Sequence, residues 1–199
     1  MGITQISWDR LNTLLAGRWV VRNGLKMLEL GSQNMYTNAF HGKMAFAKHV
    51  FLAQGVDHTS IDLNGDGGSE RLDLGTDLAD VRGGWAGHFD VVTDYGTAEH
   101  VKDLHACLAN VRNFCRPGGL MFHENPKVGN WPGHGFHYFT EDFWAKLCQA
   151  CGDTLVDVGE HAAMGNTTDG WNIHCVIEKG HGIRFPDRDT FSRFDLHAS

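Results

Sequence analysis

The sequence of 199 residues lacks any uninterrupted hydrophobic run near the length of about 18 residues that indicates a membrane-spanning helix. It also lacks an N-terminal basic segment followed by an apolar core, the pattern of a secretory signal peptide. Positive charge is scarce, with 17 Lys and Arg against 24 Asp and Glu. We therefore expect no membrane association, no nonspecific binding of nucleic-acid phosphates, and a cytoplasmic location.

Cysteine is present at five positions, an odd number that does not suit a disulfide framework. Cys148 and Cys151 form a C-x-x-C, but no second pair completes a zinc site, so we interpret the cysteines as small core residues in a reducing compartment. The chain length favours a single domain over residues 1–199. Within it we expect a helical lead-in over 1–25, a core over 26–179 and a tail over 180–199.

Short apolar segments that predict strands alternate with stretches whose apolar residues recur at helical spacing. Strands are predicted at 26–30, 59–65, 71–75, 88–96, 120–126, 154–161 and 171–180, and helices at 8–19 with Ser7 as the cap, 40–55, 101–111 and 140–152. This alternation predicts an α/β fold, a doubly wound and mostly parallel sheet of six or seven strands with helices on both faces. The last two strands are joined by a short turn, which predicts a C-terminal antiparallel hairpin.

Acidic residues lie at the carboxyl ends of the predicted strands, at the edge where such sheets bind ligands. They are Glu29, Asp62, Asp73, Asp94 and Glu124. Gathered carboxylates are poor partners for a pyrophosphate but suit hydroxyls, amines and cationic ligands. Asp62 can accept hydrogen bonds from both hydroxyls of a ribose; the alternative is a solvated turn residue.

The segment "KMLELGSQNMY" places a glycine, Gly31, directly after a strand but lacks the further glycines of a dinucleotide fingerprint, since Gln33 and Tyr36 occupy those positions. A cofactor without phosphate needs less exposed backbone than a dinucleotide does. The missing glycines therefore point away from a nicotinamide dehydrogenase, which remains the rival enzymatic interpretation.

Taken together, "LELGS", "SIDLNG", "FDVVTDYGTAEHV", "RPGGLMFHENP" and the terminal hairpin resemble the class I S-adenosylmethionine-dependent methyltransferases, over about Lys26 to Glu178. The resemblance implies a Rossmann-like methyltransferase fold, S-adenosylmethionine as cofactor, and methyl transfer to a small-molecule or saccharide-like acceptor. It implies that Asp62 binds the ribose and Asp73 the adenine. The residues implied at the methionine side are Glu29, Gly31, Asp94 and Tyr95, and Ser32 is a further candidate for cofactor binding.

The segment 123–139 is rich in glycine and aromatic residues, and we expect it to form a mobile lid over the acceptor. The candidate proton acceptors are His100, His123, His134 and His137. Each of these also has a structural interpretation. A metal held by Glu124, His134 and His137 fits by ligand type, but no spacing requires it, so we expect no metal.

Two further alternatives remain open. The same fold without catalysis would serve as a binding or structural component, for example of a virion. The tail carries Phe185, Phe191 and Phe194 among alternating charges. These aromatic residues either pack back on the domain, which we expect, or meet a partner.

Overall fold

The computed structural model describes residues 2–18, 23–37, 45–79, 83–163, 170–182, 184–194 and 197–198. The strands are β1 Gly2–Thr4, β2 Lys26–Leu30, β3 Asn34–Tyr36, β4 Asp57–Asp62, β5 Glu70–Arg71, β6 Phe89–Tyr95, β7 Cys115–Pro126, β8 His137–Tyr138, β9 Thr154–Ala162, β10 Trp171–Glu178 and β11 His197–Ala198. The α-helices are α1 Gln5–Arg18, α2 Ala47–Ala53, α3 Leu104–Phe114, α4 Glu141–Cys151 and α5 Arg188–Phe191, and the short 3-10 helices are η2 Asp66–Gly68, η3 Gly83–Trp85 and η4 Ala98–His100.

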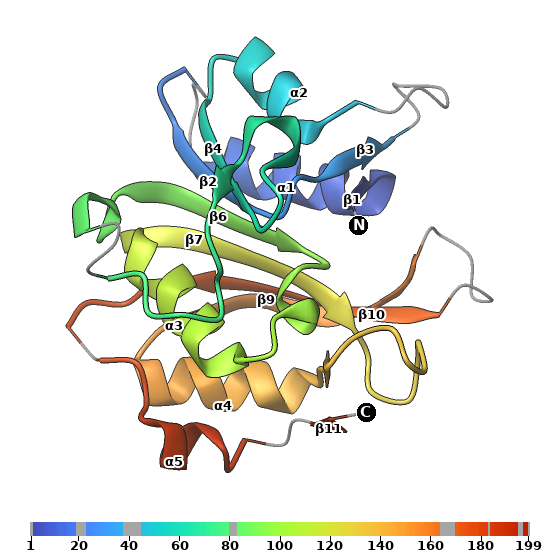
Figure 1. Ribbon diagram of the computed structural model, residues 1–199, viewed down its shortest axis with the longest axis vertical. Helices are drawn as coiled ribbons and strands as arrows, with labels where there is room; N and C mark the ends of the chain where they lie inside the picture. Colours follow the sequence, from blue (N-terminus) through green and yellow to red (C-terminus); the bar gives the residue numbers. More distant parts are fainter. Residues whose placement is uncertain are drawn as a thin grey trace.

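Within the described residues, seven strands form one sheet in the order β5-β4-β2-β6-β7-β10-β9 (Figure 1). The strands from β5 to β7 run parallel, whereas β10 is antiparallel to both of its neighbours, β7 and β9. The predicted doubly wound sheet with a C-terminal antiparallel hairpin is therefore confirmed.

Helices cover both faces of this sheet, as predicted (Figure 1). On one face α1 and α2 pack against the sheet through Leu11, Leu15 and Phe51. On the other face α3, α4 and α5 form a second core that includes Phe114 and Trp144. Because the central strands are covered on both sides, they consist of nearly continuous buried residues rather than alternating ones.

The N-terminal segment differs from the prediction. The first helix begins at Gln5, and the Thr4 hydroxyl accepts a hydrogen bond from the Ser7 backbone N–H at 3.2 Å. Thr4 therefore caps the helix, and the prediction that Ser7 does so is wrong. Strand β1, which was not predicted, pairs with β3 just after the Gly31 turn. Trp19 of the predicted helix lies outside the described residues.

Other predicted boundaries also shift. Phe40 and Met44 of the second predicted helix lie outside the described residues, and its described part is α2. Strand β5 has only two residues. Strand β7 begins at Cys115, five residues before the predicted strand, because the "RPGG" segment is included in it. A shift in the pairing register with β6 accommodates these extra residues.

The tail packs back on the domain, as expected. Phe191 is buried, and Phe185 and Phe194 pack against the same core. All five cysteines are free and buried. No helix among the described residues combines the length and hydrophobicity needed to cross a bilayer. The division into lead-in, core and tail stays a prediction.

Candidate functional site

Two cavities open at the edge of the sheet where the parallel strands end. The smaller has a volume of about 290 Å³ and collects residues that follow four different strands. Gly31, Asp62 and Asp73, which the sequence analysis placed at a cofactor site, all line it. The remaining lining residues are Ile61, Leu63, Leu72, Leu74, Thr97, His100, Val101 and Lys102.

The Gly31 turn depends on the absence of a side chain. Its φ is +74°, and a Cβ atom there would lie 2.6 Å from the Thr97 Oγ1 and 2.8 Å from the Gln33 Nε2. The following residue, Ser32, donates its backbone N–H to the Asp62 Oδ2 at 2.9 Å. The turn after β2 is thus tied directly to the end of β4, and the Asp62 carboxylate is held at the cavity wall.

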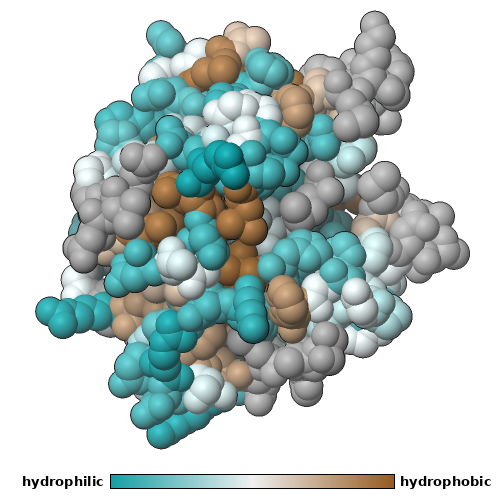
Figure 2. Space-filling model, viewed as in Figure 1, coloured by the Kyte–Doolittle hydropathy of each residue, from teal (hydrophilic) through white to brown (hydrophobic). Residues whose placement is uncertain are grey.

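The two acidic residues of the smaller cavity keep acceptor capacity for a ligand. Asp62 accepts a second backbone hydrogen bond from Asn64 at 3.2 Å, and Asp73 accepts one from Gly75 at 2.8 Å. A carboxylate has about four acceptor positions, so neither group is saturated by these bonds. Beside them, Leu63 is 68% exposed. Figure 2 shows hydrophobic side chains gathered near the middle of the face viewed.

Glu29 does not line this cavity. It is buried, accepts the Gln33 backbone N–H at 3.0 Å, and lies 3.3 Å from the His58 Nε2. Its carboxylate therefore joins the Gly31 turn to β4. These contacts give Glu29 a structural role, and its expected contact with the methionine end of the cofactor stays a prediction.

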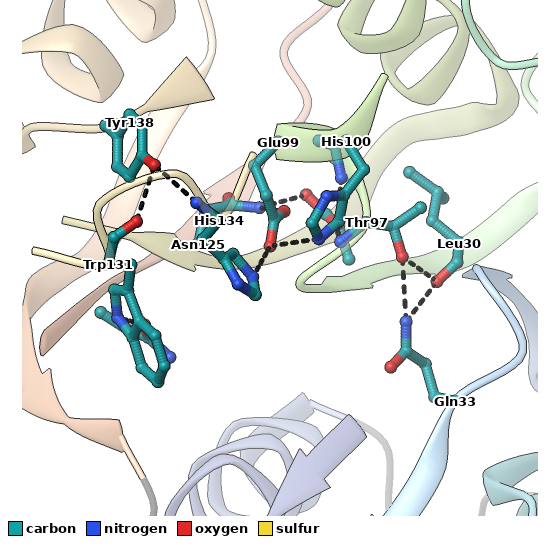
Figure 3. Close-up of polar contacts among 12 residues, drawn as sticks. Leu30, Gln33, Thr97, Glu99, His100, Asn125, Trp131, His134 and Tyr138 are labelled. Carbon is teal, nitrogen blue, oxygen red and sulfur yellow. Dashed lines mark hydrogen bonds and ion pairs between the residues drawn. The ribbon is translucent and has the colours of Figure 1, made fainter. Parts of the chain in front are cut away.

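The Gln33 side chain makes a bridge that the sequence analysis did not anticipate. Its amide Nε2 donates to the Leu30 carbonyl oxygen at 2.8 Å and to the Thr97 Oγ1 at 2.9 Å (Figure 3). The Thr97 hydroxyl in turn donates to the Leu30 carbonyl at 2.9 Å. These bonds join the turns after β2 and β6, the two central parallel strands.

Asp94 is fully buried at the end of β6 and organises the next turn. Its Oδ1 accepts the backbone N–H groups of Thr97 and Ala98, and its Oδ2 lies 3.0 Å from the His123 Nδ1 and accepts a bond from Asn125 at 3.0 Å. Burial acts to raise the pKa of Asp94, but the contacts with His123, Asn125 and Thr97 outweigh it and lower the pKa. Asp94 therefore stays ionised near neutral pH, with both carboxylate oxygens engaged.

The larger cavity, with a volume of about 370 Å³, adjoins the first at the turn after β6. Tyr95 lines it, and its hydroxyl is buried with no hydrogen-bond partner among the described residues. Burial, with a contribution from the nearby Glu124 charge, raises the pKa of Tyr95 well above its ordinary value. The other lining residues are Gly2, Thr4, Tyr36, Gly96, Glu99, Glu124, Pro126, Trp131, His134, Ala163 and Asn172.

Glu124 is a buried charge in the wall of the larger cavity. Its Oε2 accepts a hydrogen bond from the Ser7 hydroxyl at 2.7 Å, and its Oε1 lies 3.0 Å from the His161 Nε2. Burial acts to raise the pKa of Glu124, but His161 and Ser7 outweigh it and lower the pKa. Glu124 therefore adds negative charge to this cavity near neutral pH.

The four candidate histidines separate into two groups. His100 lines the smaller cavity and His134 the larger one. His123 is buried, stacked on Trp144 at a ring distance of 4.5 Å, and lines neither cavity. The His137 Nε2 lies 3.1 Å from the Val101 carbonyl oxygen, and His137 also lies outside both cavity walls.

The predicted lid over residues 123–139 is shorter than expected, because its first four residues belong to β7 and His137–Tyr138 form β8. Trp131 in the remaining loop has a φ of 57°, a left-handed conformation that is rare for an aromatic residue. The Tyr138 hydroxyl donates to the Trp131 carbonyl at 2.7 Å and accepts the His134 backbone N–H at 3.0 Å (Figure 3). This part of the loop is therefore fixed by specific contacts.

Glu99 is a site residue that was not predicted from the sequence. It is only 1% exposed, lies in η4 and lines the larger cavity. The one available signal was its place beside His100 in "EHV" after a strand end. Gln33 gave no comparable signal, since its role depends on a contact with the distant Thr97, and Trp131 was expected only as part of the aromatic segment 123–139.

No family model and no curated protein matches the sequence. The fold is similar to that of Burkholderia thailandensis 1,6-didemethyltoxoflavin-N1-methyltransferase bound to 1,6-didemethyltoxoflavin and S-adenosylhomocysteine, with a TM-score of 0.51, 17% identity and 86% of each chain covered. It is also similar to an S-adenosylmethionine-dependent methyltransferase from Archaeoglobus fulgidus, with a TM-score of 0.54, 10% identity, and 86% of this chain and 94% of that one covered.

A third solved structure with this fold is the cyclase SpnF, with a TM-score of 0.52, 16% identity, and 89% of this chain and 83% of that one covered. Identities this low establish the fold alone, and a cyclase among the neighbours illustrates that one fold carries different activities. The fold is that of the class I S-adenosylmethionine-dependent methyltransferases.

Proposed function

We propose that this protein is an S-adenosylmethionine-dependent methyltransferase that acts on a small-molecule or saccharide-like acceptor. The observation that carries the proposal is the smaller cavity, where Gly31, Asp62 and Asp73 meet at the ends of the adjacent strands β2, β4 and β5. Ligands of doubly wound sheets bind at this edge. Several structural neighbours with the same fold are methyltransferases, which supports the same chemistry.

The smaller cavity suits a nucleoside. The Asp62 carboxylate has acceptor positions for the two ribose hydroxyls, and Asp73 for the amino group of adenine. Ile61, Leu72 and Val101 supply apolar surface for the faces of the base. A dinucleotide fits less well, because Ser32 and Gln33 follow Gly31 in place of the glycines that let a pyrophosphate approach the backbone.

The methionine end of the cofactor would extend from the smaller cavity toward the larger one. When bound, S-adenosylmethionine supplies an electrophilic methyl group. We expect Glu29, Ser32 and Asp94 to support the cofactor indirectly, by holding the turns after β2 and β6 that border the methionine end. Their polar atoms are engaged in hydrogen bonds with or from the backbone of these turns. Tyr95 has an unpartnered hydroxyl at the larger cavity and is the residue we expect to donate a hydrogen bond to the ligand.

The acceptor would occupy the larger cavity, beside the two candidate histidines that the structure places in cavity walls, His100 and His134. The volume of this larger cavity, about 370 Å³, is near the lower end of the range for small-molecule sites. A small acceptor agrees with the neighbour that was solved with 1,6-didemethyltoxoflavin. The free state of all five cysteines supports the cytoplasmic location that we propose.

Thermal unfolding with S-adenosylmethionine, S-adenosylhomocysteine and NAD in parallel tests this function. A ligand at 100 times its Kd adds about 2.7 kcal/mol to the free energy of unfolding. For a chain of this size that corresponds to a rise in Tm of about 5–10 °C. We expect the rise with the two sulfur ligands and not with NAD. No shift with either sulfur ligand at millimolar concentration would refute the methyltransferase proposal and favour the binding-protein alternative.

A further inference from the structure

The Glu99 carboxylate has an unusual environment at the boundary of the two cavities. Its side chain is 1% exposed, and its Oε2 accepts a hydrogen bond from the Asn125 Nδ2 at 3.1 Å. Its Oε1 faces two imidazoles, and the Nε2 atoms of His100 and His134 each lie 3.7 Å away (Figure 3). These distances exceed those of hydrogen bonds. The buried Glu99 carboxylate therefore has one close hydrogen-bond donor and two imidazoles at longer range.

The three side chains present one carboxylate oxygen and two imidazole nitrogens within 4.8 Å of one another. In a tetrahedral zinc site, bond lengths of about 2.0–2.1 Å place neighbouring ligand atoms about 3.3 Å apart. The distances from the Glu99 Oε1 to the two histidine Nε2 atoms, 3.7 Å each, are close to that spacing. The His100 and His134 side chains are 35% and 39% exposed, so they have room to adjust to an ion.

We propose that Glu99, His100 and His134 bind a divalent transition-metal ion of the zinc type. Imidazole and carboxylate ligands together suit zinc, iron and nickel rather than calcium or magnesium. Among the described residues, Glu99, His100 and His134 are the group of three potential metal ligands whose ligand atoms lie within 4.8 Å of one another. The proposal departs from the expectation of no metal that we drew from the sequence.

The histidine from the distant loop, His134, is held in place by contacts of both its backbone and its ring. The His134 backbone N–H donates to the Tyr138 hydroxyl, and the Phe136 backbone N–H donates to the Glu99 carbonyl oxygen at 2.8 Å. The Trp131 ring lies against the His134 ring at 5.4 Å. Together with the bond from Asn125 to Glu99, these contacts orient the ligands, as outer contacts do in known metal sites.

The ligand set considered from the sequence is not brought together in the same way. Glu124 is engaged with Ser7 and His161, and the His137 ring nitrogen contacts a backbone carbonyl. Of that set only His134 contributes to the cluster that the structure forms.

The position of the site suggests its role, which rests on the proposed function. His100 lines the smaller cavity, whereas Glu99 and His134 line the larger one, so the ion would lie where cofactor and acceptor meet. Three protein ligands leave at least one coordination position open. The ion would also offset the negative charge of Glu99. We therefore infer an acceptor with an oxygen donor, a hydroxyl or a carboxylate, which binds the ion directly; the two histidines then act as ligands and not as separate proton acceptors.

Titration of the metal-stripped full chain with Zn²⁺ by calorimetry tests the site. We expect one ion per chain, and a loss of affinity of about 100-fold or more for His134→Ala and His100→Ala, because even outer contacts of metal sites contribute 10- to 100-fold. Both histidines are partly exposed, so their replacement leaves the core intact. The matched control is His49→Ala, an exposed histidine on α2 that is expected to leave Zn²⁺ affinity unchanged.

Co²⁺ in place of Zn²⁺ gives a second readout, since its visible absorption reports coordination by protein ligands. Absence of Zn²⁺ binding at millimolar concentration would overturn the proposal, as would affinity that both histidine variants retain. The titration is performed without cofactor, so its outcome is independent of the thermal shift with S-adenosylmethionine. Cofactor binding without metal binding would refute this inference alone, whereas metal binding without cofactor binding would support the site and refute only the methyltransferase function.

Discussion

Replacement of Asp62 by asparagine tests the proposed contact between this carboxylate and the ribose hydroxyls of the cofactor. The Asp62 carboxylate accepts backbone hydrogen bonds from Ser32 and Asn64 and is expected to accept two more from a ribose. Asparagine keeps one acceptor oxygen for the Ser32 amide but loses the charge and the second acceptor. Hydrogen bonds to charged groups contribute about 1.5–3 kcal/mol each, against about 1 kcal/mol for neutral ones. We therefore expect Asp62→Asn to cost about 2 kcal/mol of binding, which is a ~30-fold rise in Kd.

The matched variant is Asp73→Asn, in the wall of the same cavity. Asp73 already accepts the Gly75 backbone N–H and is expected to make one contact with adenine, so we expect a loss of about 1 kcal/mol, or ~5-fold in Kd. The assay is calorimetric titration with S-adenosylhomocysteine, with circular dichroism to verify that both variants are folded. Equal effects, or a larger effect of Asp73→Asn, would show that Asp62 does not bind the ribose.

Three further predictions concern stability. Gly31→Ala should lower the free energy of unfolding by about 2–3 kcal/mol, because the φ at this position is +74° and the new Cβ would lie 2.6 Å from the Thr97 Oγ1. The control Gly129→Ala, at a φ of +79° with no atom within 4 Å of the new Cβ, should lower it by only about 1 kcal/mol. Equal losses for the two variants in urea denaturation would contradict the close contact at Gly31. Thr140→Ala removes the hydroxyl that caps α4 and should cost about 1 kcal/mol in the same assay, so an unchanged midpoint would argue against this cap. The pKa values of Asp94 and Glu124 are lower in the folded protein than the ordinary values of 3.8 and 4.5, so their ionised carboxylates stabilise the fold in full at a pH above those ordinary values. This stabilisation is lost as the pH falls through the folded-state pKa values, and Tm should therefore decrease between pH 6 and pH 3. A Tm that stays constant over this range would contradict the lowered pKa values.

The order of strands and helices could be predicted because it depends on local patterns. "KMLEL" and "FDVVTDY" form the central strands β2 and β6, as their short apolar segments beside turn residues indicate. The short turn before the last strand indicated the antiparallel hairpin. Boundaries were harder: Thr4 rather than Ser7 caps α1, since both residue types favour that position and only the register of the first turn distinguishes them.

Within the site, the residues at strand ends could be predicted, because parallel strands deliver their carboxyl ends to one edge. This rule placed Gly31, Asp62 and Asp73 together. It gave no information on side-chain direction, so His123 was predicted at the acceptor although it points into the core beside Trp144. Glu99 was missed because its environment depends on His134, which is distant in the sequence.

The central claim is that the smaller cavity holds the nucleoside of S-adenosylmethionine, and a crystal structure of the protein grown with S-adenosylhomocysteine tests it most directly. We predict ribose hydroxyls within hydrogen-bond distance of the Asp62 carboxylate and adenine beside Asp73 and Val101. A nucleoside bound in the larger cavity, or no bound ligand at millimolar concentration, would contradict the account.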